Sequence, residues 1–107
     1  MSFDIPVLLL TWRRPETTRQ VIEAIRPVAP SRLYVASDGP RNAVEARAVD
    51  ATRALMTQLV DWPCQIKTRY SETNQGCQLG VSAAITWFFE HEQAGICLLY
   101  TSDAADE

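Results

Sequence analysis

The sequence has few of the residues that metal sites, disulfide scaffolds and membrane spans require. Its 107 residues include one histidine, His91, and three cysteines with no Cys-x-x-Cys pair, which argues against a zinc site or a disulfide framework and favours a reducing compartment. The longest apolar run, residues 5–10, is far shorter than the roughly 20 residues of a membrane-spanning helix. The N-terminus lacks the positive segment of a signal peptide. We therefore expect a cytoplasmic protein without a transmembrane segment.

Three catalytic or phosphate-binding motifs and an excess of positive charge are also missing. The chain contains no Gly-x-x-x-x-Gly-Lys-Ser/Thr, no Gly-x-Gly-x-x-Gly after its first strand and no Gly-x-Ser-x-Gly. The formal net charge is −3, so no broad basic field is available for nucleic acid. These absences argue against a P-loop NTPase, a dinucleotide-binding enzyme, a serine hydrolase and a nucleic-acid-binding protein.

The sequence does contain an alternation of strand-like and helix-like segments within the length of one domain. This order, β-α-β-α-β-α-β, predicts an α/β fold of the Rossmann-like type, with a mostly parallel sheet. If the first strand pairs with both the second and the fourth, a topological switch point lies at its carboxyl end. The expected strands are residues 5–11, 33–37, 65–70 and 96–99, and the expected helices begin at Pro15, after Asn42 and at Leu79.

Local patterns add detail to three of these elements. Asn42 and Glu45 have the spacing of a capping box at the start of the second helix. Polar alternation in residues 65–70 indicates an edge strand. The third helix, residues 79–91, is rich in apolar residues, and we expect it to be mostly buried.

Polar loops follow the second and third expected strands, where ligands bind in open α/β sheets. Asp38 can accept a hydrogen bond from a base N–H or a ribose hydroxyl, and it can equally form an Asx turn ahead of Gly39. Asn74 and Gly76 precede a helix, where backbone N–H groups can bind pyrophosphate. An ordinary helix cap followed by a turn glycine accounts for the same two residues.

Four arginines and one helical glycine lie near this end of the expected sheet. Arg13, Arg14, Arg41 and Arg69 are suited to phosphate, although each alone is also an ordinary surface charge. Together they indicate an anionic ligand. Gly80 lies one turn into the third helix, where glycine costs roughly 1 kcal/mol relative to alanine. A close contact with a strand or a ligand would explain this glycine, and so would chance.

Three segments, in this order and spacing, resemble a known family. They are PVLLLTWRRP at residues 6–15, VASDGPR at 35–41 and NQGC at 74–77. They resemble the N-terminal part of a family 2-type GT-A glycosyltransferase, in the nucleotide-diphospho-sugar transferase superfamily, over roughly residues 4–98. The resemblance implies a three-layer α/β/α arrangement, with residues 1–98 as the half that binds the nucleotide sugar.

The resemblance also implies which residues contact the donor, a nucleoside-diphosphate sugar. In the family, the loop after the first strand and the acid after the second hold the nucleoside, and an Asn-x-Gly loop lies beside the donor. The matching residues here are Thr11, Arg13, Asp38, Asn74 and Gly76, with Arg69 just upstream of the last two.

The family's metal site has no match in this sequence. After the fourth strand the family carries an acidic pair that binds Mn²⁺ or Mg²⁺, which neutralises the leaving diphosphate. Leu99, Tyr100 and Thr101 stand where those acids are expected, and Asp103 and Asp106 follow out of register. We therefore predict no catalytic and no metal-binding residue, and interpret residues 99–107 as an atypical tail that follows a truncation.

The leading hypothesis is a glycosyltransferase-like domain that binds a nucleotide sugar, with an acceptor that the sequence does not define. The alternatives are a noncatalytic nucleotide-binding α/β module and an inactive fragment that retains only the fold. An intact acidic pair in a longer version of the same gene would favour the enzyme, whereas its absence there would favour the binding module.

We predict that the chain as given transfers no sugar, because the side chains of residues 99–101 cannot hold the metal that the leaving diphosphate needs. Incubation with radiolabelled sugar nucleotides, Mn²⁺ and a mixture of acceptors should give no transfer above a control without protein. Protein-dependent turnover would contradict the prediction and would assign a metal-binding role to Asp103 or Asp106.

Overall fold

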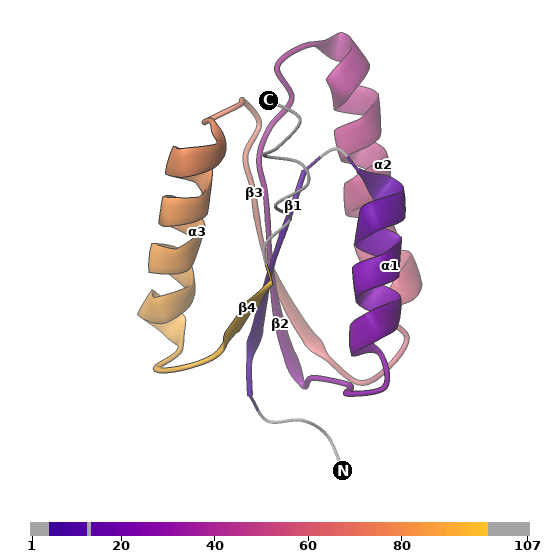
Figure 1. Ribbon diagram of the computed structural model, residues 1–107, viewed down its shortest axis with the longest axis vertical. Helices are drawn as coiled ribbons and strands as arrows, with labels where there is room; N and C mark the ends of the chain where they lie inside the picture. Colours follow the sequence, from indigo (N-terminus) through magenta and orange to yellow (C-terminus); the bar gives the residue numbers. More distant parts are fainter. Residues whose placement is uncertain (1–4, 13, 99–107) are drawn as a thin grey trace.

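The computed structural model describes residues 5–12 and 14–98, which form a parallel sheet and three helices. The four strands lie in the order β3-β2-β1-β4, and their carboxyl ends point to the top of Figure 1. This arrangement confirms the predicted α/β class. The elements are β1 (Val7–Thr11), α1 (Pro15–Ile25), β2 (Arg32–Ser37), α2 (Ala43–Leu59), β3 (Gln65–Tyr70), α3 (Cys77–His91) and β4 (Ile96–Leu98).

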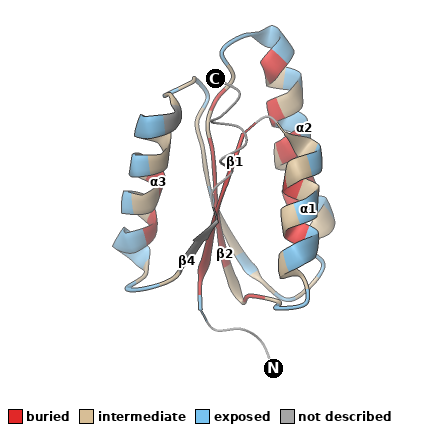
Figure 2. Ribbon diagram, viewed as in Figure 1, coloured by how far each residue is buried: buried red, intermediate tan, exposed pale blue. Residues whose placement is uncertain are grey.

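The helices cover both faces of the sheet, with α1 and α2 on one face and α3 on the other (Figure 1). Alternate side chains of β1 and β2 therefore enter two separate apolar cores. These central strands are buried along nearly their whole length (Figure 2). Burial on both faces explains why their sequences are nearly continuous apolar runs. The core under α1 and α2 contains Val7, Leu9, Ile22, Leu33, Val35 and Met56, and the core under α3 contains Leu8, Leu10, Tyr34, Ala36, Ala84 and Phe88.

Strand β1 pairs with both β2 and β4, so the predicted switch point at its carboxyl end is confirmed. Strand β3 pairs with β2 and is the last strand in the sheet order, which confirms the edge position predicted from its polar alternation. Within the described residues, no helix is both long enough and apolar enough to cross a membrane.

Helix α2 begins with the predicted cap in a slightly altered form. The Asn42 Oδ1 accepts a hydrogen bond from the backbone N–H of Glu45 at 2.9 Å, as a capping box requires. The Glu45 carboxylate in turn accepts a hydrogen bond from the backbone N–H of Arg41, at 2.9 Å, and Arg41 lies one residue before the cap. Both Glu45 oxygens also accept from the Arg41 guanidinium, which compensates for the burial of this carboxylate.

The prediction that the third helix is mostly buried is wrong, and the helix starts at Cys77 rather than Leu79. Ala84 and Phe88 are buried against the sheet, whereas Leu79 is 69% exposed and Phe89 46% exposed. A single helix packs only one stripe of side chains on a sheet, so apolar composition alone does not decide which residues are buried. Among residues 5–12 and 14–98, no element covers the outer stripe of α3.

A partly buried carboxylate fastens the carboxyl end of α3 to the sheet. Glu92 Oε2 accepts hydrogen bonds from the Tyr34 hydroxyl at 2.7 Å and from Arg32 Nε at 3.0 Å. Burial and the Glu92 carboxylate raise the pKa of Tyr34 to about 12. The Tyr34 hydrogen bond, with help from the charges of Arg32 and Lys67, holds the pKa of Glu92 below its usual range.

The shifted pKa of Glu92 makes part of the stability dependent on pH. An unfolded glutamate has a pKa of about 4.3, so Glu92 contributes fully above that value and its contribution is lost as the pH falls through the lower folded pKa. We expect Glu92→Gln to lower the free energy of unfolding by about 1 kcal/mol at pH 7. In urea denaturation, the difference in free energy of unfolding between Glu92→Gln and the wild type should be smaller at pH 3 than at pH 7. The control is Glu90→Gln, which removes an exposed carboxylate from α3. An equal difference in free energy of unfolding at both pH values would contradict the prediction.

Candidate functional site

The carboxylate of Asp38 joins the loops that follow β2 and β3. Its Oδ1 accepts hydrogen bonds from the backbone N–H groups of Gly39 and Gln75, both at 2.8 Å. Its Oδ2 accepts from Asn74 Nδ2 at 3.2 Å, across 36 positions of sequence. An Asx turn would bond the N–H two residues further along the chain, but that residue is Pro40, which has no N–H. Beyond its local bond to Gly39, Asp38 therefore fastens the neighbouring loop.

Asn74 holds the same junction from the other side. Its Nδ2 also donates to the Gly39 carbonyl at 2.9 Å, and its Oδ1 accepts from the backbone N–H of Gly76 at 3.1 Å. Gly76 is the N-cap residue of α3, with φ at +88°, a conformation that favours glycine, and no side chain caps the helix there. Asn74 thus shapes the loop ahead of α3 without capping the helix, while the turn-glycine reading of Gly76 is confirmed.

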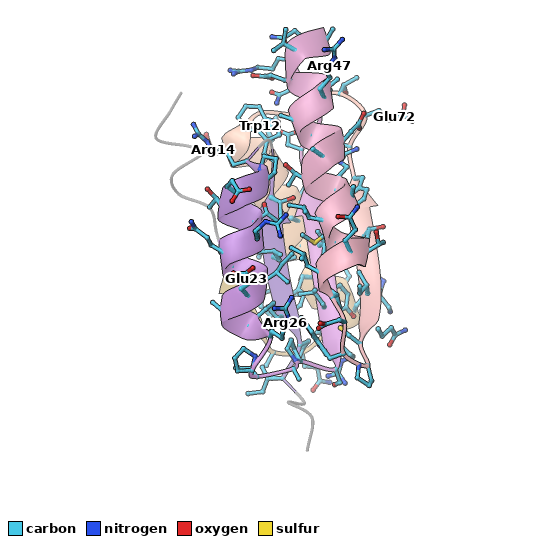
Figure 3. All side chains as sticks on the ribbon, turned by 90° about the vertical axis from the view of Figure 1, so that its right-hand side faces the viewer. Trp12, Arg14, Glu23, Arg26, Arg47 and Glu72 are labelled. Atoms are coloured by element: carbon cyan, nitrogen blue, oxygen red, sulfur yellow. The ribbon has the colours of Figure 1, made fainter. Side chains whose placement is uncertain are left out.

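Gly39 is where the loops after β1, β2 and β3 meet. A Cβ atom on Gly39 would lie 2.5 Å from the backbone carbonyl of Thr73, so only glycine allows the two loops to come this close. The Gly39 carbonyl also accepts a hydrogen bond from the buried indole of Trp12, at 3.1 Å from Nε1. Figure 3 shows Trp12 toward the same end of the molecule as Arg47 and Glu72, whereas Arg26 lies toward the opposite end.

Arg53, on α2, is the principal residue of this region that sequence reasoning missed. Its Nη2 donates to the carbonyl oxygens of Ser37, Asp38 and Ser71 at 3.2, 3.2 and 2.8 Å, and its Nε donates to Ser37 Oγ at 3.0 Å. Its guanidinium lies 4.6 Å from the centroid of the Tyr70 ring. The only available signal was an arginine beside the buried stripe of α2, and that pattern does not say what the side chain reaches.

Burial lowers the pKa of Arg53 from its ordinary value, although the neighbouring Tyr70, Asp50 and Asp38 act in the opposite direction. An arginine remains charged despite such a shift. The consequence is a positive charge fixed under the backbone of Asp38, on the face of the sheet opposite to α3. Both faces of the β2 terminus are therefore held by hydrogen bonds to ionised side chains.

Three of the four predicted arginines are described, and Arg14, Arg41 and Arg69 all lie near the carboxyl end of the sheet, although their contacts differ. Arg41 is paired with Glu45, with 2.6 Å between Nη2 and Oε2, and its guanidinium lies 5.0 Å from the Trp12 ring centroid. Arg69 pairs in register with Ala36, so it lies on the α3 face of β3, and within the described residues no hydrogen bond or ion pair engages it. Arg14 is the N-cap residue of α1, and Arg13 lies outside the described residues.

The other predicted site residues fall into two groups. Asp38, Asn74 and Gly76 come together on the side of the sheet that α3 covers. Thr11 pairs in register with Ser37 and follows the alternation of Val7 and Leu9, which places it on the opposite face. It is 6% exposed, and its Oγ1 has no hydrogen-bond partner among the described residues. Residues 99–107, with Asp103 and Asp106, lie outside the described residues.

Gly80 approaches the same carboxylate from α3. A Cβ atom on Gly80 would lie 3.7 Å from Asp38 Oδ2 and 3.8 Å from its Cγ, which is ordinary van der Waals contact. The region thus combines three features. Asp38 Oδ2 accepts one hydrogen bond from the described residues, Arg69 lies on the edge strand β3, and α3 begins without a side-chain cap from the described residues. These groups can accept a hydrogen bond from a ligand and attract an anion.

Searches against protein-family models, curated proteins and solved structures found no match to this chain.

The geometry of Arg53 leads to a prediction about stability. Arg53→Lys keeps the charge but cannot span three carbonyl oxygens and stack on Tyr70, because an ammonium presents its donors from a single point. We expect this change to lower the free energy of unfolding by about 2 kcal/mol in urea denaturation. Arg47→Lys, an exposed position on the same helix, is the matched control. Equal denaturation midpoints for the two variants would show that the contacts of Arg53 add little stability.

Proposed function

We propose that this chain binds a nucleoside diphosphate at the carboxyl edge of its sheet, as the donor-binding half of a glycosyltransferase-like domain. The observation that carries the proposal is the Asp38 carboxylate, which is fixed by two loops beside the switch point. In open α/β sheets, ligands bind outside the carboxyl ends of the strands at such a point. The position of Asp38 beside this point supports the role that we propose for it toward the nucleoside.

The hydrogen bonds leave Asp38 with capacity for a ligand. A carboxylate has about four acceptor positions, and the described part of the chain fills two on Oδ1 and one on Oδ2. A ribose hydroxyl or a base N–H can occupy the remaining position. In this proposal, Arg69 and the backbone N–H groups at the start of α3 attract the diphosphate through bidentate hydrogen bonding and the helix dipole.

The remaining parts of the proposed function follow from the resemblance of the sequence to the GT-A family. Residues 1–98 would form the N-terminal half of a three-layer GT-A domain in the cytoplasm, and the parent reaction would displace the nucleoside diphosphate from an activated sugar by an acceptor hydroxyl. The family uses a divalent metal for the leaving diphosphate. Within the described residues, no group of three or more His, Cys, Asp or Glu side chains is placed to hold a metal ion. We therefore assign no metal ligand among residues 5–12 and 14–98.

Calorimetry with UDP, GDP, ADP and CDP tests the proposed function. We expect weak binding of UDP or GDP, and a loss of about ten- to a hundredfold in affinity for Asp38→Ala, because a hydrogen bond to a charged acceptor is worth roughly 1.5–3 kcal/mol. Asp38→Asn disturbs the loops less than Asp38→Ala does. It keeps an oxygen for the N–H groups of Gly39 and Gln75, but it replaces Oδ2 by an amide group that can accept neither from a ligand nor from Asn74.

Asp50→Asn, which removes an exposed carboxylate from α2, is the control and should bind as the wild type does. Circular dichroism of each variant should confirm an intact fold. Absence of binding by the wild type to all four nucleotides would refute the proposed function, and equal affinity of wild type and Asp38→Asn would remove Asp38 from the site.

A further inference from the structure

Gly80 differs from the other three glycines because no local requirement explains it. Gly39 is required by the close approach of the Thr73 backbone, and Gly76 by its positive φ. A side chain on Gly95 would overlap the Phe88 ring. At Gly80 the backbone has no positive φ, and among residues 5–12 and 14–98 an added Cβ atom would meet nothing closer than Asp38 Oδ2, at 3.7 Å.

Gly80 also lies at a position where alanine would favour the helix. Its backbone N–H donates to the Gly76 carbonyl at 2.8 Å, so it already belongs to the hydrogen-bonded part of α3. Alanine is the better helix former in such a position. The protein thus forgoes local stability at the one helical residue whose missing side chain faces the Asp38 carboxylate.

The space beside Gly80 adjoins the less occupied oxygen of that carboxylate. Asp38 Oδ1 accepts from two backbone N–H groups, whereas Oδ2 accepts only from Asn74 among the described residues. A hydrogen-bond donor must come within about 2.7–3.2 Å of Oδ2. A methyl group at van der Waals distance from the same oxygen would cover part of this approach without displacing any protein atom.

We propose that Gly80 is a specificity-determining residue, whose missing side chain keeps open the approach by which one N–H or O–H donor of a nucleoside reaches Asp38 Oδ2. This inference rests on the proposed function, because it presupposes a nucleoside at this edge of the sheet. In this proposal Gly80 limits the width of the site, and the nucleoside makes a single hydrogen bond to one carboxylate oxygen of Asp38.

The decisive variant is Gly80→Ala, because stability and binding should change in opposite directions. We expect the melting temperature to rise by about 4 °C, since helix propensity improves without a clash. The affinity for whichever of UDP or GDP the wild type binds should fall about tenfold or more, as expected when a hydrogen bond is obstructed. A purely structural glycine would not give this combination.

Ser82→Ala is the matched control. It improves helix propensity on the same helix, at an exposed position away from the sheet, and should leave the affinity unchanged. Titration of the wild type with 2′-deoxy and N-methylated-base analogues of the bound nucleotide then identifies the donor. A loss of affinity for the deoxy analogue assigns the contact to the ribose hydroxyl, and a loss for the methylated analogue assigns it to the base N–H.

Several results would overturn the inference. If wild type and Asp38→Asn differ in nucleotide affinity but Gly80→Ala binds as the wild type does, the proposed function stands and the role of Gly80 fails. If Gly80→Ala lowers the melting temperature by several degrees, the glycine serves packing. If both analogues bind as the parent nucleotide does, no such donor contacts Oδ2. If the wild type binds no nucleotide, the inference fails together with the proposed function.

Discussion

The hydrogen-bonded junction at Asp38 and Gly39 is the constraint on which the carboxyl edge of this protein depends. The Asp38 carboxylate accepts from backbone N–H groups on both sides of the junction, and the Gly39 carbonyl accepts from the Trp12 indole and the Asn74 amide. Three loops that leave three adjacent strands are thereby fixed to two consecutive residues. Because the Cβ atom of any other residue at position 39 would strike the Thr73 backbone, the junction requires glycine there.

Ionised side chains hold this junction from both faces of the sheet. Arg53 reaches the backbone carbonyls of Ser37, Asp38 and Ser71 from α2, while the Asp38 carboxylate itself projects toward α3. Hydrogen bonds to charged groups are stronger than those between neutral groups, so these contacts fix the loops. In the proposed function, loops fixed in this way would lose less conformational entropy when a nucleotide binds.

Ion pairs hold residues at both ends of the sheet. At the amino end of the sheet, Glu92 engages Arg32 and the Tyr34 hydroxyl. At the carboxyl end, Glu45 binds the Arg41 guanidinium, whereas Arg69 has no hydrogen bond or ion pair among the described residues. The acids thus pair with Arg32 and Arg41, and in the proposed function Arg69, on the same face as Asp38, is the arginine that would meet a phosphate.

The order of the elements, the parallel sheet and the Asn42 cap could be predicted from the sequence, because hydrophobic periodicity and capping are local properties. The sequence also pointed to Asp38, Asn74 and Gly76, because polar residues after strands share one edge of a parallel sheet. The support that Arg53 gives the junction and the position of Thr11 on the other face depend on how the elements pack together. Long side chains reach across elements, and a strand residue's face depends on register. The exposed Leu79 likewise shows that burial depends on what packs against a helix rather than on its composition.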